Sequence, residues 1–104
     1  MQIRATKVFA KEMNKRIKGN YCIESIELIK IPHDSAYVRI GGGWDDKDID
    51  FDEWTVKCIK VTYKPECYAC PRLVSTGELN RLCNRISELT IENYVEAFLD
   101  VFEI

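Results

Sequence analysis

The chain has 104 residues, of which 46% are hydrophobic and 31% are charged, and its formal net charge at pH 7 is −2. This composition is too apolar for a disordered chain, and the charge is too nearly balanced for a protein that binds nucleic acid through bulk positive charge. The length fits one domain with one modest hydrophobic core, so we expect a single domain over residues 1–104.

The N-terminus and the cysteines predict the cellular compartment. Residues 1–7, MQIRATK, lack the apolar core of a signal peptide, and no apolar run in the chain is long enough to cross a bilayer. An odd number of cysteines without a secretory signal indicates reduced thiols. We therefore expect a cytoplasmic protein that makes no membrane contact. The cysteines are Cys22, Cys58, Cys67, Cys70 and Cys83.

A first helix is predicted over residues 6–18. Thr6 can accept a hydrogen bond as its N-cap, and Gly19 with Asn20 can end it. The apolar positions of this segment recur at helical spacing, which predicts one buried face. These positions are Phe9, Ala10, Met13 and Ile17.

Three strands are predicted after this helix, over residues 21–31, 37–40 and 54–63. The first ends at Pro32, and its alternation slips between Leu28 and Ile29, which indicates a bulge or burial on both faces. The second is followed by three glycines, and the third alternates β-branched and aromatic residues. Residues 44–53 form an acidic hairpin connection between the last two strands, and residues 64–72, with two prolines, form a loop.

Two helices are predicted at the C-terminal end of the chain. Ser75 and Glu78 form a capping box before the first, and Thr90 can cap the second. Their apolar positions are Leu79, Leu82, Cys83 and Ile86 in the first, and Ile91, Tyr94, Val95, Phe98 and Phe102 in the second. The resulting order, α-β-β-β-α-α, predicts an α+β fold in which helices pack a three-stranded antiparallel sheet.

Residues 45–53 hold six acidic residues and one lysine. In an extended segment alternate side chains point the same way, about 6.6 Å apart. The carboxylates of Asp46, Asp48, Asp50 and Asp52 would then form a row that repels itself unless solvent, a metal or a cationic partner faces it. The residues expected to bind a protein partner are Trp44, Asp45, Asp46, Asp48, Asp50, Asp52, Glu53 and Trp54.

Three interpretations of this acidic segment are open. It is a solvated hairpin tip, or an edge that binds a cationic protein with a tryptophan as anchor. The third is a calcium loop, because the spacing D-x-D-x-D resembles the opening of one. Against calcium, the sixth position from Asp46 is Phe51 rather than glycine, and the twelfth is Lys57 rather than glutamate.

Residues 1–20 contain six basic residues and one acidic residue. Five of the basic residues fall in one arc of the first helix at about 100° per residue, which predicts either a solvated face or a ridge that binds phosphates or carboxylates. As a nucleic-acid site, the ridge would consist of Arg4, Lys7, Lys11, Lys15 and Lys18.

The last helix carries an acidic arc, formed by Glu88, Glu92, Glu96, Asp100 and Glu103. With the basic first helix and the acidic hairpin connection, this arc gives the molecule an electric dipole. Such a dipole would orient a highly charged partner, and it would also let two copies pair head to tail as a homodimer.

No set of residues indicates a catalytic or metal site. The spacing C-x8-C-x2-C-x12-C of Cys58, Cys67, Cys70 and Cys83 supplies enough ligands for zinc, but strong zinc signatures have two close pairs and this one has one. The C-x-x-C pair lacks the strand–helix context of a redox site. His33 is the only histidine of the sequence, and no second histidine is present that could act as a base for a nucleophilic cysteine. We expect no enzyme activity, no metal and no cofactor.

Residues 3–14, IRATKVFAKEMN, resemble the N-termini of small accessory proteins of phages and conjugative elements in Gram-positive bacteria. Some of these proteins are anti-CRISPRs. The resemblance implies a small inhibitor that binds a nuclease effector such as Cas9, with acidic residues on the cationic surface that the effector uses for DNA. The basic helix does not follow from that model. The second expectation is therefore an accessory protein that binds DNA or RNA directly through this helix, and the third is a zinc-stabilised adaptor.

Overall fold

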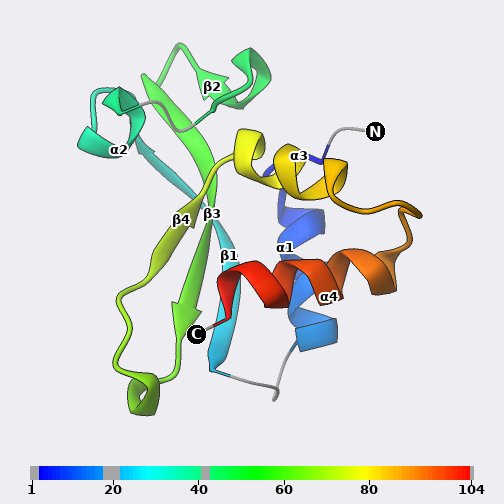
Figure 1. Ribbon diagram of the computed structural model, residues 1–104. Coiled ribbons are helices and arrows are strands. Elements are labelled where there is room, and N and C mark those ends of the chain that lie inside the picture. The colour runs from blue at the N-terminus through cyan, green and yellow to red at the C-terminus, as the bar shows by residue number, and fades with distance from the viewer. Residues whose placement is uncertain (1–2, 18–21, 41–42, 104) are drawn as a thin grey trace.

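The structure is a computed structural model that describes residues 3–17, 22–40 and 43–103. Its elements in chain order are α1 (Lys7–Ile17), β1 (Ile23–Pro32), α2 (Ala36–Arg39), the 3₁₀ turn η1 (Asp46–Asp48), β2 (Ile49–Asp50), β3 (Thr55–Tyr63), the 3₁₀ turn η2 (Pro65–Cys67), β4 (Arg72–Val74), α3 (Thr76–Asn84) and α4 (Ile91–Phe102). Helices α1, α3 and α4 form one layer and the sheet forms the other (Figure 1). This arrangement confirms the predicted α+β class.

Strand β3 is the centre of the sheet. It pairs with β1 along one side, and along the other side it pairs with β2 near its start and β4 near its end. All of these pairings are antiparallel, as predicted. The described residues form four strands rather than the predicted three, because the predicted strand over residues 37–40 is absent while β2 and β4 each add a short segment to one side of β3.

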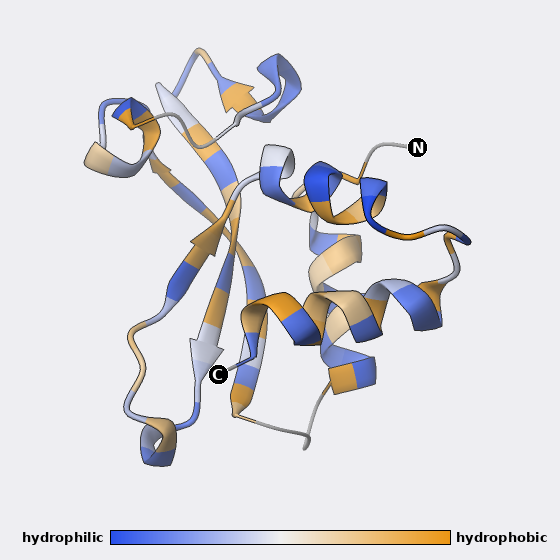
Figure 2. Ribbon diagram, viewed as in Figure 1, coloured by the Kyte–Doolittle hydropathy of each residue, from blue (hydrophilic) through white to orange (hydrophobic). Residues whose placement is uncertain are grey.

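The main hydrophobic core lies between the sheet and the three long helices. Ile59, Val61 and Tyr63 alternate along β3 and point toward the helices, where Met13 of α1 and Phe98 of α4 are fully buried. Figure 2 shows the apolar residues of α3 and α4 on the sides that face the rest of the molecule. The periodicity of the sequence therefore identified the inner faces of the helices, although Ile91, at the start of α4, is exposed.

Helix starts are fixed by side-chain caps at the predicted residues. The hydroxyl of Thr6 accepts from the N–H of Phe9 at 3.0 Å, and that of Thr90 accepts from the N–H of Asn93 at 3.1 Å. Ser75 accepts from the N–H of Glu78 at 3.2 Å. The predicted ends of the first helix, Gly19 and Asn20, lie outside the described residues.

The prediction of a strand over residues 37–40 is wrong, because residues 37–39 belong to α2 and Ile40 is its C-cap. Ser35 caps this short helix by accepting from the N–H of Val38. The hydroxyl of Tyr37 donates to the carbonyl of Leu73 at 2.7 Å and to the carboxylate of Glu78. These tertiary bonds hold the segment as a helical turn, and they occupy the glutamate that the sequence assigned to a capping box.

The prediction of an unbroken loop over residues 64–72 is also incomplete. Arg72, at its end, begins β4 and pairs with Val61 of β3. Three residues are too few to show a strand period, and the two prolines nearby indicated a loop. The slip between Leu28 and Ile29 reflects burial on both faces, since both side chains are half-buried, whereas the register shift of β1 lies between Ile23 and Ser25.

Two glycines let the loop after α2 pack against the start of α3. A Cβ atom at Gly77 would lie 2.1 Å from the carbonyl oxygen of Gly43, which no side chain can occupy. Gly43 has a φ of +73°, a conformation that glycine adopts without strain. The glycine at the end of the glycine run therefore serves backbone packing between two elements far apart in the chain.

The structure pairs Cys22 with Cys67 in a disulfide, with a Cα–Cα distance of 6.0 Å. The expectation of reduced thiols is therefore wrong for Cys22 and Cys67, whereas Cys58, Cys70 and Cys83 are free. The cytoplasmic location loses the support that it drew from the cysteine count. Five cysteines allow at most two disulfides, and only the fold shows that one forms and which two cysteines meet in it. None of the described helices is long and apolar enough to cross a membrane.

The contact between the two glycines predicts the effect of a small substitution. Gly77→Ala should lower the free energy of unfolding by about 1–3 kcal/mol, because the added methyl group meets fixed backbone. This result would oppose intrinsic helix propensity, which favours alanine over glycine by about 1 kcal/mol. Denaturant unfolding measures the change, with the exposed Asn84→Ala in the same helix as a control expected within about 0.5 kcal/mol of the parent. A more stable Gly77→Ala would contradict the close approach.

The cysteine arrangement predicts how many thiols react under three conditions. In the native protein a thiol reagent should modify Cys70, which is exposed, while Cys58 and Cys83 are buried. Burial also raises the pKa of Cys58 to about 11, so almost none of its reactive thiolate form is present at pH 8. Denaturation should expose these two further thiols, and denaturation with a reductant should expose all five. Five reactive thiols without a reductant would exclude the disulfide.

Candidate protein-binding site

The acidic segment of the sequence folds into a hairpin between β2 and β3. Asp50 pairs with Thr55 across the ladder, and its carboxylate accepts from the N–H groups of Asp52 and Glu53 at 3.2 Å each. These bonds form the turn and lower the pKa of Asp50, with the bond from Glu53 as the largest cause. Lys30 of β1 lies 2.7 Å from Glu53 and 3.4 Å from Asp50, which ties the turn to the sheet.

The turn of this hairpin carries two exposed aromatic side chains. Phe51 is 64% exposed and Trp54 is 56% exposed. Trp54 has a φ of +53°, which costs a bulky residue on the order of 1–3 kcal/mol. Its carbonyl accepts from the N–H of His33 at 3.0 Å, and its ring lies 4.8 Å from the imidazole ring. The fold thus holds a strained, partly exposed tryptophan in one orientation. We call residues 50–54 the hairpin tip.

The expected row of four parallel carboxylates is not formed. The segment is not extended, because the side chain of Asp45 accepts from the N–H of Lys47 and starts the turn η1. Asp46 and Asp52 are exposed, whereas Asp48 is buried with 3% of its surface accessible. The prediction failed because a short carboxylate can satisfy its own backbone, and such local bonds compete with an extended chain.

Two further residues of the predicted site face the interior of the protein. The carboxylate of Asp45 lies 3.4 Å from the guanidinium of Arg4. The ring of Trp44 lies 5.7 Å from that of Tyr37 in an edge-to-face contact, and Trp44 is half-buried. Of the eight predicted residues, the structure therefore brings Asp50, Asp52, Glu53 and Trp54 together at the hairpin tip and leaves Asp46 exposed nearby in the chain.

Phe51 is the site residue that sequence reasoning missed. The four alternating aspartates are expected in one row, and Phe51 is not among the residues expected to bind a partner. In the structure it lies in the turn itself, where no sheet partner covers it. The sequence signal for its exposure is its position between Asp50 and Asp52, because aspartates favour turns and a turn exposes side chains that a strand would bury.

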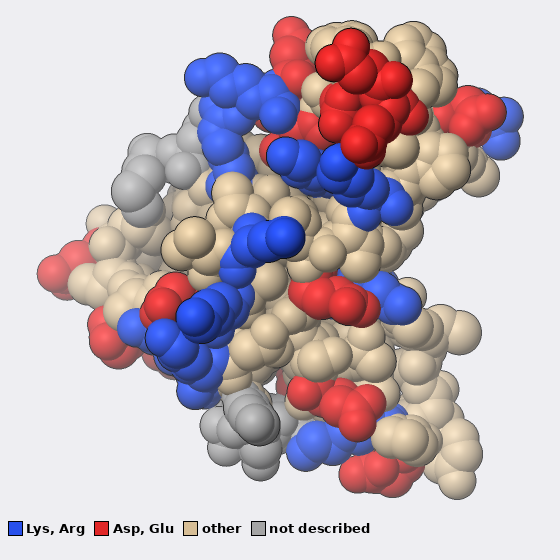
Figure 3. Space-filling model, turned by 180° about the vertical axis from the view of Figure 1, so that it is seen from behind, with Lys and Arg blue, Asp and Glu red and all other residues tan. Residues whose placement is uncertain are grey.

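The basic ridge of the first helix is only partly present. Arg4 forms an ion pair with Asp45, and Lys15 lies 3.3 Å from Glu12 of its own helix. Lys18 is outside the described residues. Lys7 and Lys11 are exposed, and no described carboxylate lies within ion-pair distance of either ammonium group. Figure 3 shows basic side chains gathered over α1 and acidic ones gathered at the β2–β3 end of the molecule.

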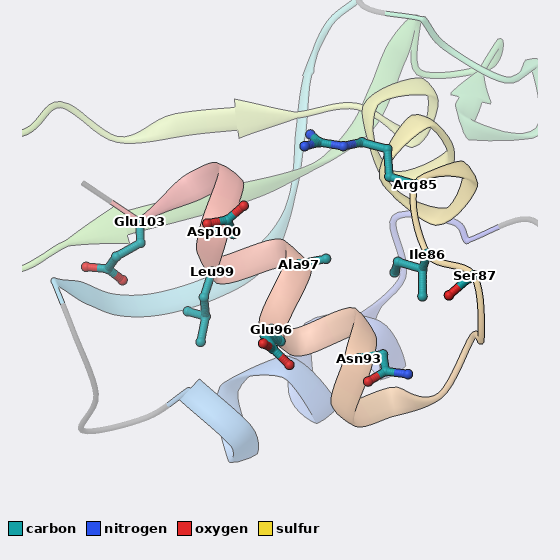
Figure 4. A pocket seen from close by; sticks show the side chains of 9 residues that line it. All are labelled: Arg85, Ile86, Ser87, Asn93, Glu96, Ala97, Leu99, Asp100 and Glu103. Atoms are coloured by element: carbon teal, nitrogen blue, oxygen red, sulfur yellow. The ribbon is translucent and has the colours of Figure 1, made fainter.

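The acidic arc of the last helix lines one side of an open groove of about 780 Å³ beside the α3–α4 connection. Glu96, Asp100 and Glu103 come from α4 and its C-terminal end, and Arg85 faces them from the end of α3 (Figure 4). The Glu103 carboxylate accepts from the N–H of Cys22, so this acid holds the start of β1. None of the nine lining residues is a histidine, a cysteine or a lysine.

The predicted zinc ligands are dispersed in the structure. Cys67 is in the disulfide, Cys58 is buried in β3, Cys83 is buried in α3 and Cys70 is exposed. Within residues 3–17, 22–40 and 43–103, no group of three or more histidine, cysteine or acidic side chains lies close enough to hold a metal ion.

The site that the geometry defines is therefore a rigid hairpin tip with two exposed aromatic rings and a rim of carboxylates. Such a surface can bind another macromolecule by apolar contact and ion pairing, and it holds no nucleophile paired with a base. Comparison of the chain with protein-family models, with curated proteins and with solved structures finds no match.

Proposed function

We propose that this protein is a non-enzymatic binding protein whose hairpin tip docks on a cationic surface of a protein partner. The observation that carries the proposal is the exposure of Phe51 and Trp54 in one turn whose backbone is fixed on both sides. Apolar side chains on a monomer are usually exposed singly, and aromatic rings gain most from being covered in an interface.

The charges around the two rings indicate the chemistry of the partner. Asp52 and Glu53 are exposed beside the rings, and Asp46 is exposed a few residues earlier. On a basic partner these carboxylates would pair with arginine or lysine and would steer the approach of the two proteins. Because strand pairing and the Asp50 turn hold the tip in place before binding, little conformational entropy is lost on docking.

For the class of partner we propose a nuclease effector of the nucleic-acid machinery, with Cas9 as the example that the N-terminal resemblance implies. The carboxylates of the tip would occupy positions that DNA phosphates take on the effector, which makes the protein an anti-CRISPR-type inhibitor. Support comes from the acidic rim and from a net charge of −2, which would not repel a basic groove. Direct binding of DNA or RNA by α1 stays the alternative prediction, with Lys7 and Lys11 as its exposed residues.

The aromatic contribution can be tested with a substitution that does not strain the backbone. Trp54→Gly removes the indole and suits the positive φ, so folding stability should be unchanged or higher while partner affinity falls by about tenfold or more. The matched control is Tyr68→Gly, because Tyr68 is 95% exposed and has a φ of +51° at the far end of β3. Binding to an immobilised Cas9–guide RNA complex by surface plasmon resonance measures both variants.

The charge contribution is tested by a triple substitution, Asp46→Asn, Asp52→Asn and Glu53→Gln, which keeps side-chain size and removes three charges. Association with the same complex should slow and become less dependent on salt, because steering by long-range charge acts mainly on the association rate. A parent protein that neither binds the complex nor inhibits its DNA cleavage would refute the proposed partner class. Binding that survives both sets of substitutions would refute the hairpin tip as the site.

A further inference from the structure

Strand β1 is the outer strand of the sheet on one side, and part of its outer edge is open. In an antiparallel ladder the N–H and C=O of one residue point to the same side, and successive residues alternate. The backbone N–H and C=O of Ile26 both bond to the side chain of Asn14 in α1, with the N–H at 2.7 Å. The backbone groups of Ile26 therefore point to the outer edge of the sheet, although its side chain is buried. By alternation the backbone groups of Leu28 and Lys30 also face outward.

The open part of this edge has sharp limits. At Ile26 the side-chain amide of Asn14 forms the two hydrogen bonds that a neighbouring strand would otherwise form. Pro32 ends the strand, has no N–H, and its carbonyl accepts from Ser35. Between these limits, no strand or side chain of the described part of the chain bonds to the outward backbone groups of Leu28 and Lys30. Two donors and two acceptors are therefore available to an added strand.

A shallow groove of about 460 Å³ runs between α1 and this edge. Ala10, Ile26 and Leu28 supply its apolar surface, and Lys7 and Lys11 line it with no described carboxylate in ion-pair distance. The one acidic residue among those described in the lining, Glu27, lies 4.0 Å from Lys60 of β3. Helix and strand run in opposite directions, and the rise of about 6 Å over the four helical residues from Lys7 to Lys11 is close to that of two strand residues, about 6.6 Å. The lysines are therefore spaced like every second residue of a strand lying along β1.

We propose that this groove binds an extended peptide of alternating acidic and apolar residues, which adds to the sheet as a strand beside β1. Side chains of the added strand that face α1 would carry the carboxylates, opposite Lys7 and Lys11. Those on the other face would be apolar, beside the half-buried side chains of Ile29 and Ile31. Main-chain hydrogen bonds give affinity in this mode of recognition, and the alternating side chains give specificity.

The chemistry of the edge favours a peptide over a nucleic acid. A phosphodiester offers acceptors alone, so it could satisfy the outward N–H groups and the lysines but would leave the outward carbonyls of Leu28 and Lys30 without donors. A peptide backbone supplies both donors and acceptors at the strand repeat. The site adjoins the hairpin tip at Lys30, whose side chain pairs with Asp50 and Glu53 while its backbone belongs to the open edge. The proposal does not depend on the function proposed for that tip.

Backbone methylation tests this proposal without changing any charge. The probe is a capped peptide of about seven residues that alternates glutamate and valine and carries a fluorophore for anisotropy titration. One version is N-methylated at every glutamate and a second at every valine. In a strand only one of these two sets of N–H groups can face β1. We expect one version to lose at least about tenfold in affinity and the other to bind like the unmethylated peptide. Equal affinity for all three, or equal loss in both methylated versions, would overturn strand addition.

Charge variants of the protein locate the groove. Lys7→Gln with Lys11→Gln should weaken the peptide by roughly tenfold, while Lys47→Gln, at an exposed lysine outside the groove, should not. Unchanged melting temperatures show that all of these variants remain folded. A single-stranded oligothymidylate is the competing probe. If it binds as tightly as the peptide and loses affinity in the same double variant, the lysines form a phosphate-binding face and the proposal fails. No binding of the unmethylated peptide at low salt would also refute it.

Discussion

The fold depends on one strand that is covered on both faces and paired on both edges. Strand β3 is the only described strand that pairs with every other, and it holds β1 on one side and β2 and β4 on the other. Ile59 and Val61 point toward the helices, while Val56 and Cys58 are fully buried on the opposite face. The buried positions of such a strand tolerate no polar substitution, and the strand tolerates no shift in register, since a shift of one residue would exchange its two faces. The hairpin tip and the open edge of β1 are both held by it.

Several polar side chains that look functional in the sequence satisfy backbone groups in the structure. Asp45 and Asp50 form the two turns of the acidic segment, Asn14 closes one position of the β1 edge and Glu103 holds the start of β1. Each bond removes a polar group from the set that a partner can reach. The polar surface that a partner can reach is therefore smaller than the composition indicates. The contributions of its few side chains are easier to distinguish by substitution.

Ion pairs within the protein also reduce the electric dipole that the sequence predicts. Arg4 pairs with Asp45, so basic and acidic segments that are far apart in the sequence neutralise each other in part where they meet. Lys30 does the same for the turn at Asp50 and Glu53. Besides the acids of α4, the acidic hairpin tip and the lysines of α1 remain as two oppositely charged surfaces, which makes two binding events by one small domain physically compatible.

Local hydrogen bonds and hydrophobic period are sufficient to predict the α+β class, the three long helices with their caps at Thr6, Ser75 and Thr90, and the central strand. The other features depend on contacts between segments that are distant in the chain. Residues 36–39 form a helix that Ser35 caps and that Tyr37 ties to Leu73 and Glu78, and β4 formed because β3 offered an unpaired edge. Which carboxylates face solvent, which cysteines meet and where β1 stays open all depend on neighbours distant in the chain, and no local pattern carries that information.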